Sequence, residues 1–337
     1  MASLGNWTFS PLVSAFPTTV FPNMALWNVS NPIKNLTYQI QVSWPFEWPN
    51  AIEDVTNKTA LTMYVLDGNA MGTTAAEAFK RRKPVDQFQP DSIVVSIGYP
   101  LTDAIYSFAQ RSIDFRPPLP TPQTPPSGAD DFIEFIDGAL RPWVRDSLFP
   151  DVRFTRDAIY GHSFGGLFVI YALIARPDMF DTYLSASPAI YFNNNSILDD
   201  VSARLGDGTA VDDGLSLGTV TTTTTTTTTT TNATTNATTN ATTNATTNAT
   251  TKPAFVVSYG SLEQFPIKRR TETLEAFDER KELYRTFHMS DICQELFYRV
   301  TASGKTRDTA IKEYAGQDHA SVAASGITDG IDYFVDW

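Results

Sequence analysis

The stretch AIYGHSFGG at residues 158–166 decides the fold of this chain. It fits the pattern Gly-x-Ser-x-Gly, with Ser163 at the centre, a β-branched and apolar run before it and an apolar run over Gly165–Ala175 after it. In this pattern a strand turns sharply into a helix, and the serine hydroxyl projects from the turn as an exposed nucleophile. The flanking glycines allow strand and helix to approach closely. The plainer alternative is a glycine-rich turn that only happens to contain a serine.

Outward from this turn, strands alternate with helices. A period-two pattern over Leu36–Val42 predicts an antiparallel strand with one wet face. Short apolar, β-branched runs are typical of strands buried on both faces of a parallel sheet, and we expect such strands at Leu61–Leu66, Ser92–Ile97, Tyr183–Ser187 and Ala254–Tyr259. Helices are expected over Thr73–Lys83, Asp130–Leu148, Arg270–Phe287 and Ile327–Trp337, and a proline-rich loop over Pro117–Ser127. This alternation predicts a three-layer α/β sandwich with a mostly parallel central sheet.

A serine is a weak nucleophile without a base, and the chain offers three histidines. His319 lies in a predicted loop before the last helix, where a fold of this kind carries its base. His162 adjoins the serine, and the sharp turn sends its side chain away from the hydroxyl, so we interpret it as structural. His288 follows a predicted helix and is expected at the surface. We therefore predict that His319 is the base.

A carboxylate should orient the base, and Glu263 follows the predicted strand Ala254–Tyr259. The order Ser163, Glu263, His319 is the order of an α/β-hydrolase. Asp318, Asp308 and Glu313 are competitors for this role. For the oxyanion hole we expect one backbone N–H from Phe164 and one from Asn69, in the turn after Leu61–Leu66; an ordinary Asp-Gly turn is the equal alternative.

Four stretches together resemble the esterase family that contains esterase D and the enterobactin esterases: VLDGN at 65–69, RSIDF at 111–115, GHSFGGLF at 161–168 and SASP at 185–188. The resemblance is greatest to its siderophore-esterase branch, including fungal enzymes that cleave triacetylfusarinine C. It implies that Ser163 and His319 perform the chemistry, and it leaves room for a Ser-His dyad without Glu263. It also suggests that Arg111 faces the substrate; the simpler alternative is an internal ion pair with Asp114.

Composition limits the possible partners. The 25 Lys and Arg residues against 37 Asp and Glu residues give a net charge of −12, which argues against nucleic acid as a partner. The basic clusters at residues 80–83 and 268–270 are too short to offset it. The single cysteine, Cys293, and the absence of histidines at metal-ligand spacing argue against a structural metal. No apolar run reaches the ~18 residues that a membrane span needs, and the proposed chemistry requires no cofactor.

A tract of threonines from Thr221, followed by an Asn-Ala-Thr-Thr repeat, interrupts the pattern. It has no apolar face that could offset the entropy of ordering it, so we expect residues 206–252 to be a disordered insertion within a single domain spanning residues 1–337. A glycosylated, mucin-like stalk is the alternative. The first residues lack a basic segment followed by an apolar one, which favours the cytoplasm despite several Asn-x-Ser/Thr sequons.

The resemblance implies a serine esterase that opens ester bonds of a ferric siderophore, so that iron can be released inside the cell. The acidic chain would not attract an anionic catecholate complex, whereas a neutral ferric hydroxamate carries no such penalty. Two alternatives stay open: an esterase of the same fold that acts on acylglutathione, feruloyl or short-chain esters, and a binding protein that keeps the serine turn without using it.

Overall fold

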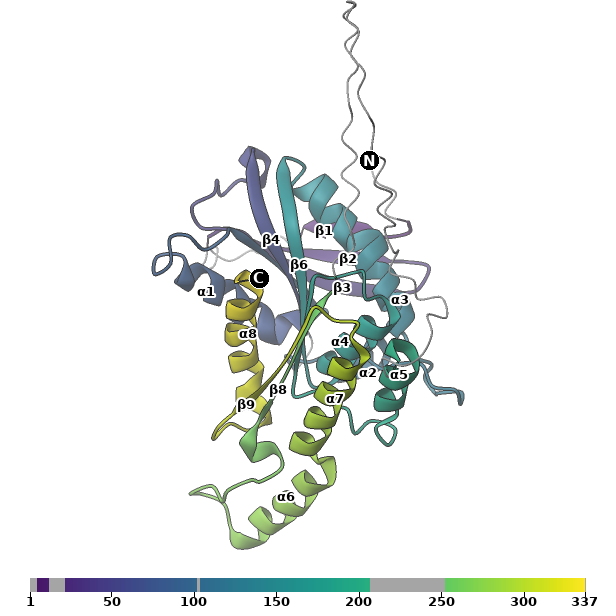
Figure 1. Cartoon of the computed structure of the whole chain (residues 1–337). Helices are drawn as coiled ribbons and strands as arrows, with labels where there is room; N and C mark the ends of the chain where they lie inside the picture. The colour runs from purple at the N-terminus through teal and green to yellow at the C-terminus, as the bar shows by residue number, and fades with distance from the viewer. Residues whose placement is uncertain (1–4, 12–21, 102–103, 207–251, 337) are drawn as a thin grey trace, which may run out of the picture.

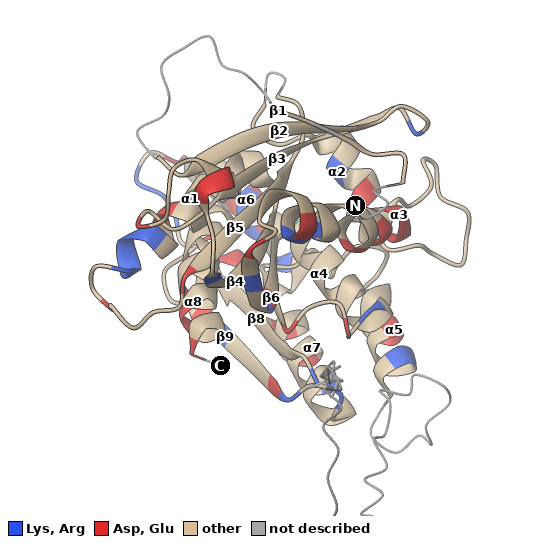
Figure 2. Cartoon of the chain, turned by 90° about the horizontal axis from the view of Figure 1, so that it is seen from above, with Lys and Arg blue, Asp and Glu red and all other residues tan. Residues whose placement is uncertain are grey.

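The computed structural model describes residues 5–11, 22–101, 104–206 and 252–336, which form helical layers on the two faces of one β-sheet (Figures 1 and 2). The tract of the predicted insertion, residues 207–251, lies outside the described residues, so its disorder stays a prediction. The prediction of an α/β-hydrolase fold is confirmed by the mostly parallel sheet with helices on both faces.

Within the described residues the sheet has nine strands in the order β1-β2-β3-β5-β4-β6-β7-β8-β9. The strands from β5 to β9 in this order pair in parallel, and β1, β2 and β3 pair antiparallel at one end. Their bounds are β1 Thr8–Pro11, β2 Met24–Asn31, β3 Leu36–Ser43, β4 Lys58–Leu66, β5 Ser92–Gly98, β6 Val152–His162, β7 Thr182–Ala186, β8 Ala254–Gly260 and β9 Asp308–Tyr314. The predicted antiparallel strand at Leu36–Val42 is therefore confirmed as β3.

Helices α1 and α8 cover one face of the sheet, and α2, α3, α4, α5 and α7 lie on the other (Figure 2). The bounds of the helices are α1 Gly68–Arg82, α2 Phe108–Asp114, α3 Ala129–Phe135, α4 Phe164–Ala175, α5 Ser196–Leu205, α6 Leu274–Phe287, α7 Met289–Ser303 and α8 His319–Val335. Short 3-10 helices occur at η1 (Ile52–Asp54) and η4 (Ser261–Glu263), and α3 continues through the π-helical segments η2 (Ile136–Leu140) and η3 (Trp143–Leu148).

The two faces bury separate apolar cores, and β4 contributes to both. Met63 and Val65 belong to the core under α1 and α8, whereas Tyr64 and Leu66 belong to the larger core on the other face. Successive side chains of a strand point to opposite faces of a sheet, so a strand covered on both sides is mostly apolar instead of alternating. This explains why Leu61–Leu66 is mostly apolar, although Thr62 is buried within it.

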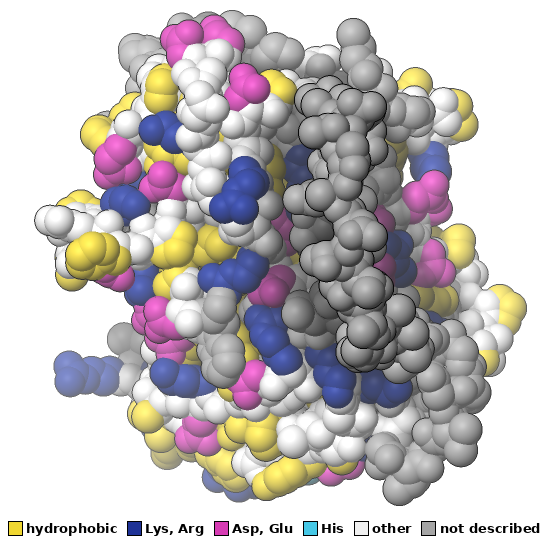
Figure 3. Space-filling model, turned by 45° about the horizontal axis from the view of Figure 1, so that its top comes forward, with side chains coloured by type: hydrophobic (Ala, Val, Ile, Leu, Met, Phe, Trp, Pro, Cys, Tyr) yellow, Lys and Arg dark blue, Asp and Glu magenta, His cyan; other side chains and the backbone are white. Residues whose placement is uncertain are grey.

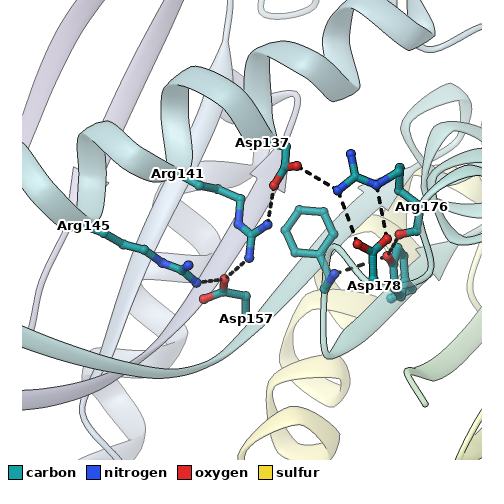
Figure 4. A network of polar contacts seen from close by, with 8 residues as sticks. Asp137, Arg141, Arg145, Asp157, Arg176 and Asp178 are labelled. Atoms are coloured by element: carbon teal, nitrogen blue, oxygen red, sulfur yellow. Dashed lines mark hydrogen bonds and ion pairs between the residues drawn. The ribbon is translucent and has the colours of Figure 1, made fainter. Parts of the chain in front are cut away.

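The predicted helix over Asp130–Leu148 is present, but only its first part is α-helical. Pro142 lies between η2 and η3 and has no N–H to donate to a helical hydrogen-bond ladder. A network of ion pairs ties this helix to β6: Asp157 accepts from Arg141 at 2.7 Å and also from Arg145, while Asp137 joins Arg141 to Arg176 (Figure 4).

Helix α6 differs from the other long helices because none of its residues is buried. It projects from the body of the molecule beyond the carboxyl end of β8 (Figure 1). The helix begins at Leu274, where the Thr273 hydroxyl accepts from the Ala276 N–H at 3.1 Å, and not at Arg270 as predicted. On the face shown in Figure 3, Lys and Arg side chains are interspersed with Asp and Glu, so that face presents both signs of charge.

Candidate active site

Ser163 occupies the sharp turn between β6 and α4, as the sequence predicts. Its backbone has φ 59° and ψ −119°, a conformation that costs a non-glycine residue about 1–3 kcal/mol. The turn is possible because Gly161 has no Cβ: an added Cβ would lie 2.2 Å from the carbonyl oxygen of Gly165. The neighbouring strand β7 holds the serine in place, since the Ser163 N–H donates to the Ala186 carbonyl at 3.0 Å.

His319 and Glu263 meet at the same edge of the sheet. The Nδ1 atom of His319 lies 2.6 Å from Oε2 of Glu263, whose side chain is only 3% exposed. Glu263 ends η4, directly after β8, which confirms its predicted place after that strand. Its second oxygen, Oε1, accepts from the Gly260 N–H at 2.7 Å and from the Ser187 hydroxyl at 2.6 Å. The carboxylate is therefore held from three sides.

The predicted loop position of His319 is wrong: it is the first residue of α8, which starts eight residues before the predicted Ile327. The reason is Asp318, whose side chain caps the helix by accepting from the Ser321 N–H at 3.1 Å. The other competing carboxylates contact different groups. Asp308 accepts from the Tyr333 hydroxyl, and Glu313 accepts from the Tyr259 hydroxyl at 3.1 Å.

The other two histidines lie in different surroundings. His288 directly follows α6 and its side chain is 63% exposed, as expected for a surface residue. His162 is 6% exposed, and its ring lies beside the ring of His319 with the centroids 4.4 Å apart. Because His162 immediately precedes Ser163, this contact brings His319 to the elbow. Among the described residues, no hydrogen bond joins the Ser163 hydroxyl to the His319 ring; catalytic hydrogen bonds are often long before substrate binds.

The two predicted oxyanion donors are both in the first turn of a helix, where N–H groups lack a partner within the helix. Phe164 begins α4, and Asn69 is the second residue of α1. The two helix starts are close, since a Cβ on Gly165 would lie 3.5 Å from the Cβ of Leu66. The Asn69 side chain is hydrogen-bonded to the backbone of Tyr99: its Oδ1 accepts from the Tyr99 N–H at 2.7 Å, and its Nδ2 donates to the Tyr99 carbonyl at 2.9 Å.

The predicted ion pair between Arg111 and Asp114 is wrong, because Arg111 pairs with Asp67. The guanidinium donates two hydrogen bonds, of 2.9 and 2.8 Å, to the two carboxylate oxygens of Asp67, and both side chains are buried. Arg111 also lies over the ring of Phe164, 5.9 Å from its centroid. A direct contact between Arg111 and substrate stays a prediction; in this structure the residue braces the turn before α1 against the elbow.

Asp114 has a different role in the interior. Its Oδ2 accepts from the hydroxyls of Tyr38 and Tyr99, and its Oδ1 accepts from the Gln110 amide. Burial raises the pKa of Asp114 to about 6, and these hydrogen bonds oppose the rise.

Sequence reasoning assigned no role to Ser187 or Asp67. Ser187 is fully buried in a left-handed conformation, with φ 41°, and donates to the candidate acid. Asp67, also left-handed at φ 50°, pairs with Arg111. Their positions in the sequence could have indicated these roles. Each residue directly follows a parallel strand next to β6, and functional side chains lie at the carboxyl ends of such strands.

The described residues contain no group of three or more His, Cys, Asp or Glu side chains placed to hold a metal ion. No helix in the described part of the chain is both long and apolar enough to cross a bilayer.

The parallel sheet, the strand-serine-helix turn and the histidine paired with a carboxylate are the features of an α/β-hydrolase. The family model described as "Putative esterase" matches residues 37–283. The chain therefore belongs to this esterase family, whose members hydrolyse esters.

Relatives extend over nearly the whole chain. It is 34% identical to a siderophore enterobactin esterase of Emericella nidulans, over 97% of both proteins. It is 32% identical to a siderophore triacetylfusarinine C esterase of Aspergillus fumigatus, over 95% of this chain and 97% of that protein. The structure of siderophore hydrolase EstA from Aspergillus nidulans matches with a TM-score of 0.77 and 33% identity, over 96% of this chain and 98% of that one.

Proposed function

We propose that this protein is a serine esterase that hydrolyses the ester bonds of a ferric hydroxamate siderophore of the fusarinine or triacetylfusarinine C type. The observation that carries the proposal is the 2.6 Å contact between His319 and the buried Glu263 beside the elbow serine. The two relatives above, named as siderophore esterases, support the substrate class. The net charge of −12 favours a neutral ferric hydroxamate over an anionic catecholate complex.

The proposed mechanism is acyl transfer in two halves. The Ser163 hydroxyl attacks the ester carbonyl carbon while His319 Nε2 takes its proton, and Glu263 stabilises the resulting imidazolium through Nδ1. The backbone N–H groups of Phe164 and Asn69 would bind the oxyanion of the tetrahedral intermediate. His319 then gives the proton to the leaving alcohol, whose C–O bond breaks. In the second half His319 deprotonates a water that attacks the acyl-enzyme, releasing the acid and restoring Ser163.

Iron belongs to the substrate in this proposal. Ester opening cuts the ligand that surrounds the ferric ion, so that the iron can be released. We place this step in the cytoplasm, where an imported complex would be opened. Cell fractionation followed by immunoblotting tests this location, and recovery of the protein only in the medium would contradict it.

The test compares wild type with Ser163→Ala on ferric triacetylfusarinine C, with products followed by mass spectrometry. The variant should lose at least about 10³-fold in kcat/KM, because the nucleophile is removed. His288→Gln serves as a control, since His288 is exposed and far along the chain from the elbow. Full activity of Ser163→Ala would overturn the proposed nucleophile.

A substrate panel separates the proposed activity from that of a general carboxylesterase. It compares ferric triacetylfusarinine C with ferric enterobactin, p-nitrophenyl acetate and S-formylglutathione. We expect the highest kcat/KM for the hydroxamate triester; a marked preference for the small esters would favour the general esterase. A fluorophosphonate probe tests the remaining alternative, because the serine of a non-catalytic binding protein would stay unlabelled.

A further inference from the structure

His162 makes a contact that its predicted structural role does not explain. Its Nε2 atom lies 2.8 Å from the backbone carbonyl oxygen of His319, and the two rings are 4.4 Å apart with their planes at 43°. His162 is the last residue of β6 and immediately precedes Ser163. The side chain therefore reaches from the nucleophile's own strand to the backbone of the candidate base.

The direction of this hydrogen bond defines which nitrogen of the His162 ring carries the proton. A carbonyl oxygen can only accept, so the Nε2 atom must carry the proton. Burial, and to a smaller extent the neighbouring His319, lower the pKa of His162 to about 3. The ring is therefore neutral at the pH at which esters are hydrolysed, and it adds no positive charge next to the imidazolium that His319 forms.

The other contacts that position His319 come from a different part of the sheet. Glu263, after β8, holds the Nδ1 atom of the His319 ring. The Leu262 N–H donates at 3.0 Å to the carbonyl of Gln317, two residues before His319. These contacts fix the histidine relative to β8, whereas the bond from His162 fixes it relative to β6, which carries the serine.

We propose that His162 is a positioning residue that holds the backbone of His319 at the elbow, so that the His319 imidazole reaches the Ser163 hydroxyl. The inference rests on the proposed function of Ser163 and His319 as nucleophile and base. A displacement of about 1 Å between reacting groups can cost about 100-fold in rate. The hydrogen bond and the ring contact together restrict the displacement of His319 along β6 and the rotation of its ring.

Two substitutions separate the lost hydrogen bond from lost packing. His162→Gln can keep an N–H donor near the position of Nε2, whereas His162→Leu removes the donor but fills similar space. In His162→Leu we expect kcat on p-nitrophenyl acetate to fall at least about tenfold, with KM changed less than about twofold. In His162→Gln we expect kcat within about threefold of wild type. His288→Gln, at an exposed site, is the control and should be unchanged.

Rates are normalised to the fraction of folded protein, taken from the amplitude of the thermal unfolding transition, so that misfolded protein does not enter kcat. A purely structural role would lower the melting temperature of both variants without separating their kcat values. Equal losses in the Gln and Leu variants, or a Leu variant with wild-type kcat, would overturn the proposal.

A second measurement needs no variant, because the chain has only three histidines. In protein labelled with ¹⁵N-histidine, NMR should show one ring in the Nε2–H tautomer that does not titrate between about pH 5 and 9. If His162, assigned through His162→Gln, has the Nδ1–H tautomer, its Nε2 atom cannot donate to the His319 carbonyl and the inference fails. If Ser163→Ala stays fully active, the proposed function fails instead, and the NMR result is unaffected.

Discussion

The carboxylate of Glu263 illustrates how single residues define this site. One oxygen faces His319, and the other accepts from the Gly260 N–H and the Ser187 hydroxyl. A carboxylate can accept on both oxygens at once, and hydrogen bonds to a charged group are stronger than those between neutral groups. The buried side chain is thereby held in the one orientation that points an oxygen at the histidine.

Glu263→Gln should therefore lower kcat by about 10² to 10⁴-fold while leaving the fold intact. A glutamine has one accepting oxygen, so it can satisfy either His319 or the pair of donors on the other side. Steady-state kinetics on p-nitrophenyl acetate would measure the change. Glu313→Gln is the matched control, because Glu313 lies exposed on β9 and its carboxylate accepts a hydrogen bond from the Tyr259 hydroxyl, away from His319. Unchanged kcat in Glu263→Gln would instead support a Ser-His dyad.

Ser187→Ala should weaken catalysis more mildly, by about tenfold in kcat with KM unchanged. The substitution removes one donor to Glu263, and partners of this kind typically contribute about 10 to 100-fold to the activity of the group they orient. Ser185→Ala is the control: Ser185 is equally buried, but its hydroxyl donates to the Gly166 carbonyl at 2.9 Å and not to the acid. Similar kinetics for the two variants would contradict a role for Ser187 in orienting Glu263.

Asp114 should make stability depend on pH. Burial raises its pKa from the ordinary 3.8 to about 6 in the folded protein, so the folded state holds the proton more tightly than the unfolded chain does. The associated stabilisation is present below about pH 4 and is lost as the pH rises to about 6, a change on the order of 3 kcal/mol. Urea unfolding of wild type and Asp114→Asn across this range measures it. A constant difference between the two proteins would contradict the prediction.

The residues that sequence could assign are those that a motif or chain order specifies. Ser163 and Glu263 each follow a recognisable strand, and the structure has both at the expected ends. The ion-pair partner of Arg111, in contrast, could not be predicted from a motif or from the order of residues along the chain. Asp114 is one helical turn away in sequence, whereas Asp67, 44 residues away in the turn after β4, meets Arg111 only through the fold. Local spacing predicts neighbours on one helix and carries no information about such long-range pairs.

At the scale of elements, the elbow depends on an approach between β6 and α4 that only glycine allows. Gly161→Ala would put a Cβ 2.2 Å from the Gly165 carbonyl oxygen, so the helix or the strand must shift, and we expect loss of soluble folded protein or of both stability and activity. Gly138→Ala is the matched control. Nothing lies within 4 Å of its added Cβ, and alanine should stabilise this helical position by up to about 1 kcal/mol. Thermal unfolding and esterase assays compare the two, and a normal Gly161→Ala enzyme would contradict the steric argument.

Element boundaries were predicted well where an apolar pattern starts abruptly and poorly where a polar cap decides. Helix α8 begins at His319 because Asp318 caps it, although the apolar pattern becomes clear only near Ile327. Strand β9 was not predicted at all. It lies at the edge of the sheet, so Asp308–Tyr314 has no fully buried residue and shows no alternation. These two misses fall where solvent covers one side of the element, so the polarity of its side chains does not indicate the backbone conformation.

At the scale of the whole molecule, the residues of β6 that stabilise the fold lie apart from the candidate nucleophile that follows this strand. Ser163 follows the carboxyl end of β6. Asp157, six residues earlier, forms ion pairs with Arg141 and Arg145 of the helical segment over residues 129–148 (Figure 4). At about 3.3 Å per residue the two positions are roughly 20 Å apart. Asp157 is 4% exposed, so two cations depend on one buried carboxylate to attach the helix to the sheet.

Asp157→Asn should therefore destabilise the protein by about 3 kcal/mol, because it leaves Arg141 without its buried counter-charge, while kcat/KM changes less than about twofold. Urea unfolding and esterase kinetics on the same preparation measure the two effects together. Asp137→Asn is the matched control. The Asp137 carboxylate also pairs with two arginines, but its side chain is 30% exposed, so water can solvate the arginines that lose their partner and the destabilisation should be smaller. A large fall in kcat/KM in folded Asp157→Asn would mean that the middle of β6 transmits strain to the elbow, and the separation of stability from chemistry along this strand would then be wrong.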